Sequence, residues 1–210
     1  MMDQNTKGKF ADQFNVSRET IDRLDVYHKL LIKWNSKINL VSRSTIEDAW
    51  QRHFVDSAQI WCLADMKAQR WIDLGSGAGF PGLVIAAMAA EKSPELEVIL
   101  VESDQRKSVF MQTAAREMGV KARVVTERIE KLEPQEADIL SARALSSLPQ
   151  LLEFAEKHRK PDGICLFPKG ERVESELTKA ATSWHISYET FPSVTDSQAV
   201  ILRIGEFHRV

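Results

Sequence analysis

A cluster of glycines carries the clearest chemical signal in this sequence. The apolar run Trp71–Leu74 is followed by four glycines within eight residues and then by an apolar, alanine-rich segment. This order predicts a strand, a tight turn and a helix. Glycine adopts positive φ readily and has no side chain, so a ligand can approach the backbone closely. Because a helix also begins here with free N–H groups, we interpret the turn as a binding site for a nucleoside-containing cofactor.

Two carboxylates flank this turn in the sequence. Asp73 lies inside the first apolar run, and Glu102 ends a second apolar run, Glu97–Glu102. A carboxylate at the end of a buried strand can accept hydrogen bonds from both hydroxyl groups of a ribose. We therefore predict that Glu102 binds the ribose of the cofactor, the alternative being a surface charge near the start of the next helix.

The glycines fit two cofactor patterns, and the first is that of a dinucleotide. Gly77, Gly79 and Gly82 match G-x-G-x-x-G, and Glu102 follows about 20 residues later, as expected for NAD. In this alignment, however, residues 75–76 separate the strand from the pattern. A dehydrogenase would also need a second, substrate-binding domain, for which this chain has no room.

The second pattern begins with the acid, as Asp73-x-Gly75-x-Gly77-x-Gly79. It resembles the first motif of the seven-stranded methyltransferases that use S-adenosylmethionine, in which the acid helps to hold the amino-acid end of the cofactor. We favour this interpretation. An NAD-dependent oxidoreductase and a non-catalytic nucleotide- or RNA-binding module stay open as alternatives, separable by cofactor preference and by turnover.

Residues 1–66 are predicted to form a helical N-terminal extension. Residues 1–16 are polar and are expected to lack structure. A helix is expected from Ser17, because apolar residues then recur every three or four positions. A second helix is expected from Ser44, since Glu47 three residues later completes a capping-box pattern.

Residues 67–210 are predicted to form one α/β domain. Short β-rich runs alternate with helical segments, which indicates a parallel sheet covered by helices on both faces. The expected parallel strands are 71–74, 97–102, 122–126, 138–142 and 163–167, and an antiparallel hairpin of 184–191 and 198–204 is expected to close the sheet. Ligands of such sheets bind at the carboxyl ends of the strands, where the candidate residues lie.

Composition limits the remaining function classes. The 210 residues are 43% hydrophobic and carry a formal net charge of -2, so an RNA-binding surface would have to be a local basic patch. No stretch reaches 18 apolar residues, and no membrane association is expected. Cys62 and Cys165 lack metal-ligand spacing, so a reduced, cytoplasmic protein without a metal site is expected. We also expect a monomer.

Five motifs in a fixed order narrow the interpretation. They are Trp34–Leu40, Arg52–Ser57, Asp73–Gly82, Ser141–Ala144 and Lys169–Gly170. Together they resemble the family of small-subunit ribosomal RNA guanine-N7 methyltransferases, long called glucose-inhibited division protein B. The resemblance implies a class I, Rossmann-like, seven-stranded fold with a helical N-terminal extension. It also implies transfer of a methyl group from S-adenosylmethionine to a guanine of 16S ribosomal RNA.

The resemblance assigns cofactor contacts to particular positions. The residues that match S-adenosylmethionine-binding positions of the family are Gly75, Phe80, Ile129, Glu130 and Arg143. The glycine pattern and the predicted strand ends add Asp73, Gly77, Gly79 and Glu102. Phe80 also fits a core position, and Glu130 also fits an exposed helix charge.

The RNA surface is expected to be basic and close to the cofactor. The predicted RNA-binding residues are Arg52, His53, Arg106, Arg128 and Lys169. Spacing by itself predicts an ion pair between Arg52 and Asp56 on one helix face, whereas the family resemblance implies that this face shapes the RNA pocket. The expected partner is small-subunit ribosomal RNA, either naked or in an assembling 30S particle.

No proton-accepting Asn-Pro-Pro-Tyr-like motif follows the predicted fourth strand. The chemistry of guanine N7 explains why none is needed. N7 has an in-plane lone pair and no proton, so it can attack the sulfonium methyl group without a general base. Arg143, after the predicted fourth strand, is therefore expected to orient the cofactor or guanine O6 and not to act as an acid or base. The alternative for Arg143 is a salt bridge to Asp138 or Glu102.

Overall fold

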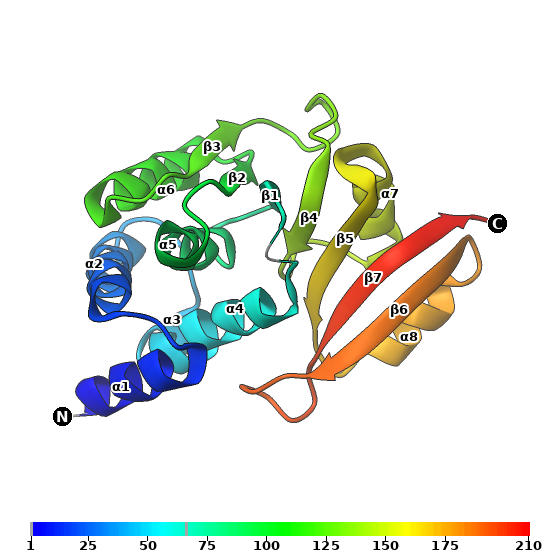
Figure 1. Cartoon of the computed structure of the whole chain (residues 1–210). Helices are drawn as coiled ribbons and strands as arrows, with labels where there is room; N and C mark the ends of the chain where they lie inside the picture. The colour runs from blue at the N-terminus through cyan, green and yellow to red at the C-terminus, as the bar shows by residue number, and fades with distance from the viewer. Residues whose placement is uncertain (1, 66) are drawn as a thin grey trace.

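The computed structural model describes residues 2–65 and 67–210 and is built on a seven-stranded sheet (Figure 1). The strand order is β3-β2-β1-β4-β5-β7-β6, with β1 to β5 parallel and β7 antiparallel to both neighbours. The strands are β1 (Arg70–Leu74), β2 (Glu97–Glu102), β3 (Arg123–Thr126), β4 (Ala137–Ala142), β5 (Arg159–Lys169), β6 (Trp184–Pro192) and β7 (Val200–Arg209). The predicted parallel sheet with a closing hairpin is confirmed.

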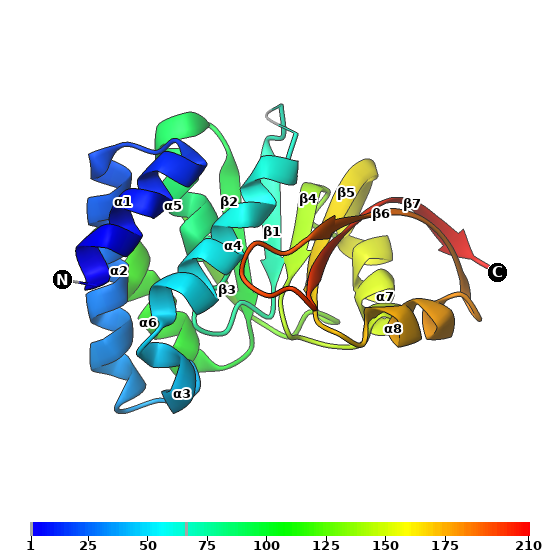
Figure 2. The ribbon, with the colours of Figure 1, turned by 90° about the horizontal axis from the view of Figure 1, so that it is seen from below.

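Helices cover both faces of this sheet (Figures 1 and 2). The α-helices are α1 (Met2–Phe14), α2 (Arg18–Asn35), α3 (Arg43–Ile46), α4 (Asp56–Ala58), α5 (Gly82–Lys92), α6 (Gln105–Met118), α7 (Leu148–His158) and α8 (Val173–Ala180). A π-helical segment (Trp50–Val55) and a 3-10 segment (Gln59–Leu63) flank α4. Residues of α1, α2, α5 and α6 share one apolar core, and residues of α7 and α8 share the other.

Alternation along the central strands connects the two cores. Trp71 of β1 and Leu100 of β2 are fully buried on the face of α2, α5 and α6. Their neighbours Ile72 and Ile99 are fully buried on the face of α7 and α8. Successive side chains of a strand point to opposite faces, so central strands covered on both sides are apolar throughout. The loops at the carboxyl ends of these strands are thereby held on a rigid frame.

The N-terminal segment differs from the prediction. Residues 1–16 were expected to lack structure, but α1 spans Met2–Phe14, and Met1 lies outside the described residues. Phe10 is 1% exposed, with its ring 4.7 Å from Phe14 and 5.7 Å from Trp50. Two aromatic anchors on a largely polar helix are enough to dock it, because each large ring buries much apolar area.

The second predicted helix is interrupted. It was expected to begin at Ser44 with a capping box, but α3 begins at Arg43 and ends at Ile46. The chain becomes helical again at Trp50, now with π-type hydrogen bonding. The predicted boundary of the helical extension falls at residue 66, which lies outside the described residues. In α6, the Asp104 side chain caps the first turn, and Gly119 ends the helix in the left-handed conformation.

Candidate active site

The glycine turn joins β1 to α5 and has one open side. Gly75, Gly77 and Gly79 have φ values of 63°, 58° and 94°. A Cβ atom at Gly79 would lie 2.5 Å from Leu83 Cδ1, so this side of the turn packs against α5. A Cβ atom at Gly77 would meet only the Gly75 carbonyl oxygen, at 3.8 Å. A ligand can therefore lie against the backbone at Gly77.

Glu102 connects this turn to the end of β2. Its Oε2 atom accepts a hydrogen bond from the Gly77 N–H at 2.9 Å, and its Oε1 atom accepts one from the Asp104 N–H at 2.8 Å. The carboxylate is half-buried. The structure thus places Glu102 beside the glycines, as the second-strand position required, and ribose binding stays a prediction.

Asp73 lies beneath the turn and supports it from inside. The residue is fully buried, and its Oδ2 atom accepts a hydrogen bond from the Gly82 N–H at 3.2 Å. Its Oδ1 atom accepts one from the Ser141 hydroxyl at 2.8 Å, which couples β1 to β4. Burial raises the pKa of the Asp73 carboxyl to about 6. The carboxylate thus anchors the start of α5, and its contact with the amino-acid end of the cofactor stays a prediction.

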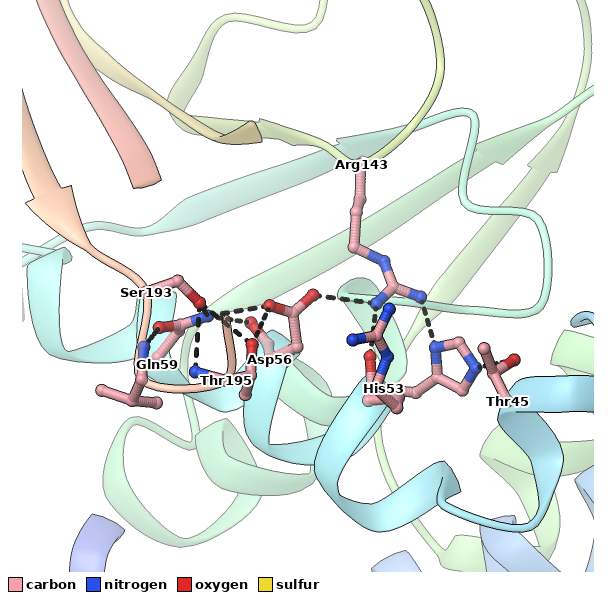
Figure 3. A network of polar contacts seen from close by, with 9 residues as sticks. Thr45, His53, Asp56, Gln59, Arg143, Ser193 and Thr195 are labelled. Carbon is pink, nitrogen blue, oxygen red and sulfur yellow. Dashed lines mark hydrogen bonds and ion pairs between the residues drawn. The ribbon is translucent and has the colours of Figure 1, made fainter. Parts of the chain in front are cut away.

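Arg143 follows β4 and reaches across to the segment 52–56 (Figure 3). Its guanidinium group donates to Asp56 Oδ2 and to His53 Nδ1, both at 3.0 Å. It also lies 5.2 Å from the centre of the Phe80 ring. A guanidinium group suits this place because it can bond in its plane and stack on a ring at the same time.

Two expected ion pairs are corrected by this arrangement. The salt-bridge alternative for Arg143 named Asp138 or Glu102, but its partner is Asp56, and Asp138 pairs with Lys160 instead. The pair of Arg52 with Asp56 is also wrong, since Asp56 faces Arg143. The spacing argument assumed an α-helix, whereas residues 50–55 are π-helical and therefore distribute their side chains differently.

His53 is enclosed and neutral. Because Arg143 donates to Nδ1, the hydrogen-bond network assigns the ring proton to Nε2, which lies 2.9 Å from Thr45 Oγ1. The ring stacks on Phe80 with centroids 5.1 Å apart. Burial first, then the charges of Arg143 and Arg52, lower the pKa of His53 to about 4. Both ring nitrogens are engaged, so His53 offers no free base.

Asp56 also ties the site to the loop between β6 and β7, a connection that sequence reasoning missed. Its Oδ1 atom accepts hydrogen bonds from Gln59 Nε2 and from the Thr195 hydroxyl, both at 2.9 Å. Gln59 Oε1 in turn accepts from the Val194 N–H at 2.9 Å (Figure 3). No sequence signal identified this loop, because its partners lie more than 130 positions away in the chain.

The remaining cofactor candidates follow β3. Ile129 is buried, and its carbonyl oxygen lies 3.0 Å from Nε2 of the buried His158. Glu130 is exposed, and its carbonyl oxygen accepts from Lys157 Nζ at 2.7 Å. The turn is therefore held against the last two residues of α7. Contact of these two residues with the cofactor stays a prediction.

The predicted RNA-binding residues do not share one environment. Arg52, Arg106 and Arg128 are exposed, whereas His53 lies in the buried network. Lys169 is drawn inward, with its side chain 8% exposed and its ammonium group 2.7 Å from Glu176 Oε2. In this structure Lys169 is therefore committed to an internal ion pair and is not displayed for a phosphate.

Within residues 2–65 and 67–210, no group of three or more His, Cys, Asp or Glu side chains is arranged to hold a metal ion. In the same part of the chain, no helix has the length and apolar character needed to span a bilayer.

Comparison with known proteins gives close sequence relatives. A family model described as rRNA small subunit methyltransferase G matches residues 20–202. A ribosomal RNA small subunit methyltransferase G from Ruegeria pomeroyi is 53% identical over 200 residues, which cover 95% of this chain and 98% of that protein. The protein of the same name from Rhodospirillum centenum is 50% identical, over 94% of this chain and 89% of its own length.

Solved structures agree on the fold. M. jannaschii TYW2, determined in complex with AdoMet, superimposes with a TM-score of 0.55 at 13% identity, covering 83% of this chain and 80% of that one. An O-methyltransferase from Bacillus cereus, in complex with SAH, gives a TM-score of 0.57 at 12% identity, covering 87% and 91%. The predicted Rossmann-like methyltransferase fold is confirmed.

Proposed function

This chain belongs to the rRNA small subunit methyltransferase G family, and from that premise we propose that it methylates N7 of a guanine in small-subunit ribosomal RNA. It is an S-adenosylmethionine-dependent methyltransferase. The observation that supports the proposed target atom is the network of Arg143, His53 and Asp56, because it places a fixed cation beside the glycine turn without a free base.

The chain's own residues fit the cofactor. S-adenosylmethionine supplies an electrophilic methyl group on a sulfonium when it is bound. Glu102 would hold the ribose, the backbone at Gly75, Gly77 and Gly79 would face the amino-acid part, and the turn at Ile129 and Glu130 would contact the adenine. The open backbone at Gly77 supports this assignment, since a cofactor needs room directly against the turn. Asp73 would keep the turn in shape from below.

The engagement of the titratable side chains around Arg143 supports N7 as the proposed acceptor atom. Around Arg143, both nitrogens of His53 are engaged, Asp56 is paired, and Asp73 is fully enclosed. An amino group or ring carbon would need a base to remove its proton, whereas N7 needs none. Holding N7 in line with the methyl group can lower the barrier by roughly 7–11 kcal/mol. Arg143 would contribute by orienting the cofactor or guanine O6.

The two alternatives to a methyltransferase belong to different classes of protein. An NAD-dependent oxidoreductase fails because the matched relatives are named methyltransferases. A non-catalytic nucleotide- or RNA-binding module would bind without turnover. We further propose that the protein acts as a cytoplasmic monomer.

Methyl transfer from labelled S-adenosylmethionine to unmodified small-subunit RNA tests the proposal. The RNA is offered naked and as a ribonucleoprotein particle, and it is then treated with borohydride and aniline, which cleave at 7-methylguanine. We expect label in the RNA and one new cleavage site. Label without cleavage would place the methyl group on another atom, and cofactor binding without label on either substrate would favour the non-catalytic module.

A further inference from the structure

A groove lies beside the candidate site, between the end of α2, the short helix α3 and the start of α6. Its volume is about 680 Å³. Three cationic side chains line it, Lys37, Arg43 and Arg106, together with apolar side chains of three isoleucines. None of its lining residues is acidic. The groove is therefore a local basic surface on a chain whose formal net charge is -2.

The three cations are available to an external anion. In the described part of the chain, Lys37 and Arg43 form no ion pair and are exposed. Arg106 is 74% exposed and lies 3.4 Å from Asp104, a long contact for an ion pair. Such an exposed pair holds its arginine weakly, so a phosphate can compete for it.

The groove is also preformed. Residues of the loop after α2 line it, and the Asn35 side chain fastens this loop: Oδ1 accepts hydrogen bonds from the N–H groups of Leu40 at 2.9 Å and Val41 at 3.0 Å. Ile32, on the last turns of α2, is 50% exposed in the groove. A fixed wall with exposed apolar area and separate cations suits a ligand with alternating apolar and anionic parts.

Covalent and hydrogen-bonded links connect the groove to the candidate site. Arg106 follows Glu102, the predicted ribose ligand, by one short turn. On the other side, α3 carries both Arg43 and Thr45, and the Thr45 hydroxyl bonds to His53 of the Arg143 network. Figure 2 shows α3 near the ends of α2 and α6. An extended ligand lying in the groove would thus continue toward Arg143.

We propose that this groove binds the sugar-phosphate backbone of an unpaired RNA stretch next to the methylated guanine. The inference rests on the proposed function and extends it to the path of the substrate. In A-form RNA, N7 faces a deep and narrow groove that side chains cannot enter, so the target guanine must be unpaired. Lys37, Arg43 and Arg106 contact phosphates, and the isoleucines contact sugars and base faces.

Two triple variants of equal charge test the groove. The groove variant is K37A/R43A/R106A. The control is R18A/R116A/K121A, which removes exposed cations at the start of α2, at the end of α6 and in the loop after α6; Arg116, like Arg106, is 74% exposed beside an acid. Binding of a labelled single-stranded RNA is measured by fluorescence anisotropy over a range of salt. We expect the groove variant to lose affinity at least about ten-fold and its salt slope to fall by about two, since each single-strand phosphate contact contributes roughly 0.7.

Further measurements separate the possible outcomes. Affinity for S-adenosylmethionine and the melting temperature should stay unchanged in both variants, and the charge-conserving variant K37R/R43K/R106K should keep most RNA affinity. Equal losses in the groove and control variants would overturn the groove proposal, as would an equal loss of affinity for the same RNA annealed to its complement. If the wild-type protein binds RNA through the groove but transfers no methyl group, the proposed function fails while the groove stands.

Discussion

At the scale of single residues, Arg143 is the side chain on which the proposed site depends most. It bonds to Asp56 and His53 and lies over the ring of Phe80. In Arg143→Lys the charge remains, but one ammonium group cannot make both bonds while staying over the ring. We expect kcat/KM for RNA methylation to fall about 100-fold, because losing a partly buried hydrogen bond to a charged group costs about 1.5–3 kcal/mol.

The matched control for this variant is Arg123→Lys. Arg123 is half-exposed on β3 and pairs with Glu97 at the opposite edge of the strands. Steady-state methyl transfer with labelled cofactor should be unchanged there. Wild-type turnover in Arg143→Lys would contradict the orienting role.

His53 makes a prediction about pH. Burial lowers its pKa in the folded protein to about 4, from 6.5. Between these values the unfolded chain binds a proton that the folded chain does not, so His53 causes stability to fall as the pH drops from 6.5 to about 4. The maximal loss is about 3 kcal/mol. In His53→Gln this loss disappears, and the variant's deficit in unfolding free energy should shrink toward acid pH.

Urea unfolding at several pH values between 4 and 7 measures this difference. Asp73, whose pKa is raised to about 6 by burial, has the opposite effect in part of this range, but it is common to both proteins and cancels in the comparison. His185→Gln, at an exposed position of β6, is the control. Parallel stability profiles for wild type and His53→Gln would show that His53 is not held neutral.

At the scale of elements, the glycine turn separates support of the fold from contact with the cofactor. Gly79→Ala would place its Cβ against Leu83 with φ at 94°, so we expect a loss of roughly 2–5 kcal/mol in stability. Gly77→Ala meets no side chain and should lose only about 1–2 kcal/mol from its left-handed backbone.

Calorimetric titration with S-adenosylmethionine then distinguishes the two positions. Because the added methyl group of Gly77→Ala enters the space where we place the cofactor, its affinity should fall at least about ten-fold, or 1.4 kcal/mol. Wild-type affinity in Gly77→Ala would move the cofactor away from this side of the turn.

The helix α1 is the element that the sequence pattern did not predict. Its docking depends on Phe10, which is 1% exposed between Phe14 and Trp50. Phe10→Ala should lower the free energy of unfolding by about 3–5 kcal/mol, as for other large buried rings. Gln13→Ala, exposed on the same helix, should change it by less than about 0.5 kcal/mol. Similar urea midpoints for the two variants would mean that α1 is not docked in solution.

At the scale of the whole molecule, charge distribution matters more than net charge. The chain carries a formal charge of -2, yet exposed cations lie near the carboxyl edge of the sheet, among them Lys37, Arg43, Arg52 and Arg106. Binding through a few phosphate contacts weakens as the salt concentration rises. We therefore expect kcat/KM for RNA methylation to fall roughly 10- to 100-fold between 50 and 200 mM salt. Cofactor affinity should change little. An equal salt dependence of both would argue against an RNA substrate.

Much of the architecture follows from local chemistry that is visible in the sequence. The central strands can be predicted from the sequence because they are buried on both faces and are therefore apolar throughout. The ends of α6 have local causes too: the Asp104 side chain can cap a helix, and Gly119 can adopt the left-handed conformation that ends one. The order of five short motifs indicated the family, and the glycine spacing indicated where we propose that the cofactor binds.

The partners of the site residues were decided only in three dimensions. Arg143 bonds to a segment about 90 positions away, and Asp56 bonds to a loop more than 130 positions away. Local spacing paired Asp56 with Arg52 instead, because it assumed an α-helix where the chain forms a π-helix. Lys169 was expected to be exposed and to bind RNA, but its side chain is buried in an ion pair with Glu176. Propensity and spacing act over a few residues, whereas ion pairing and burial depend on which distant side chains the fold brings together.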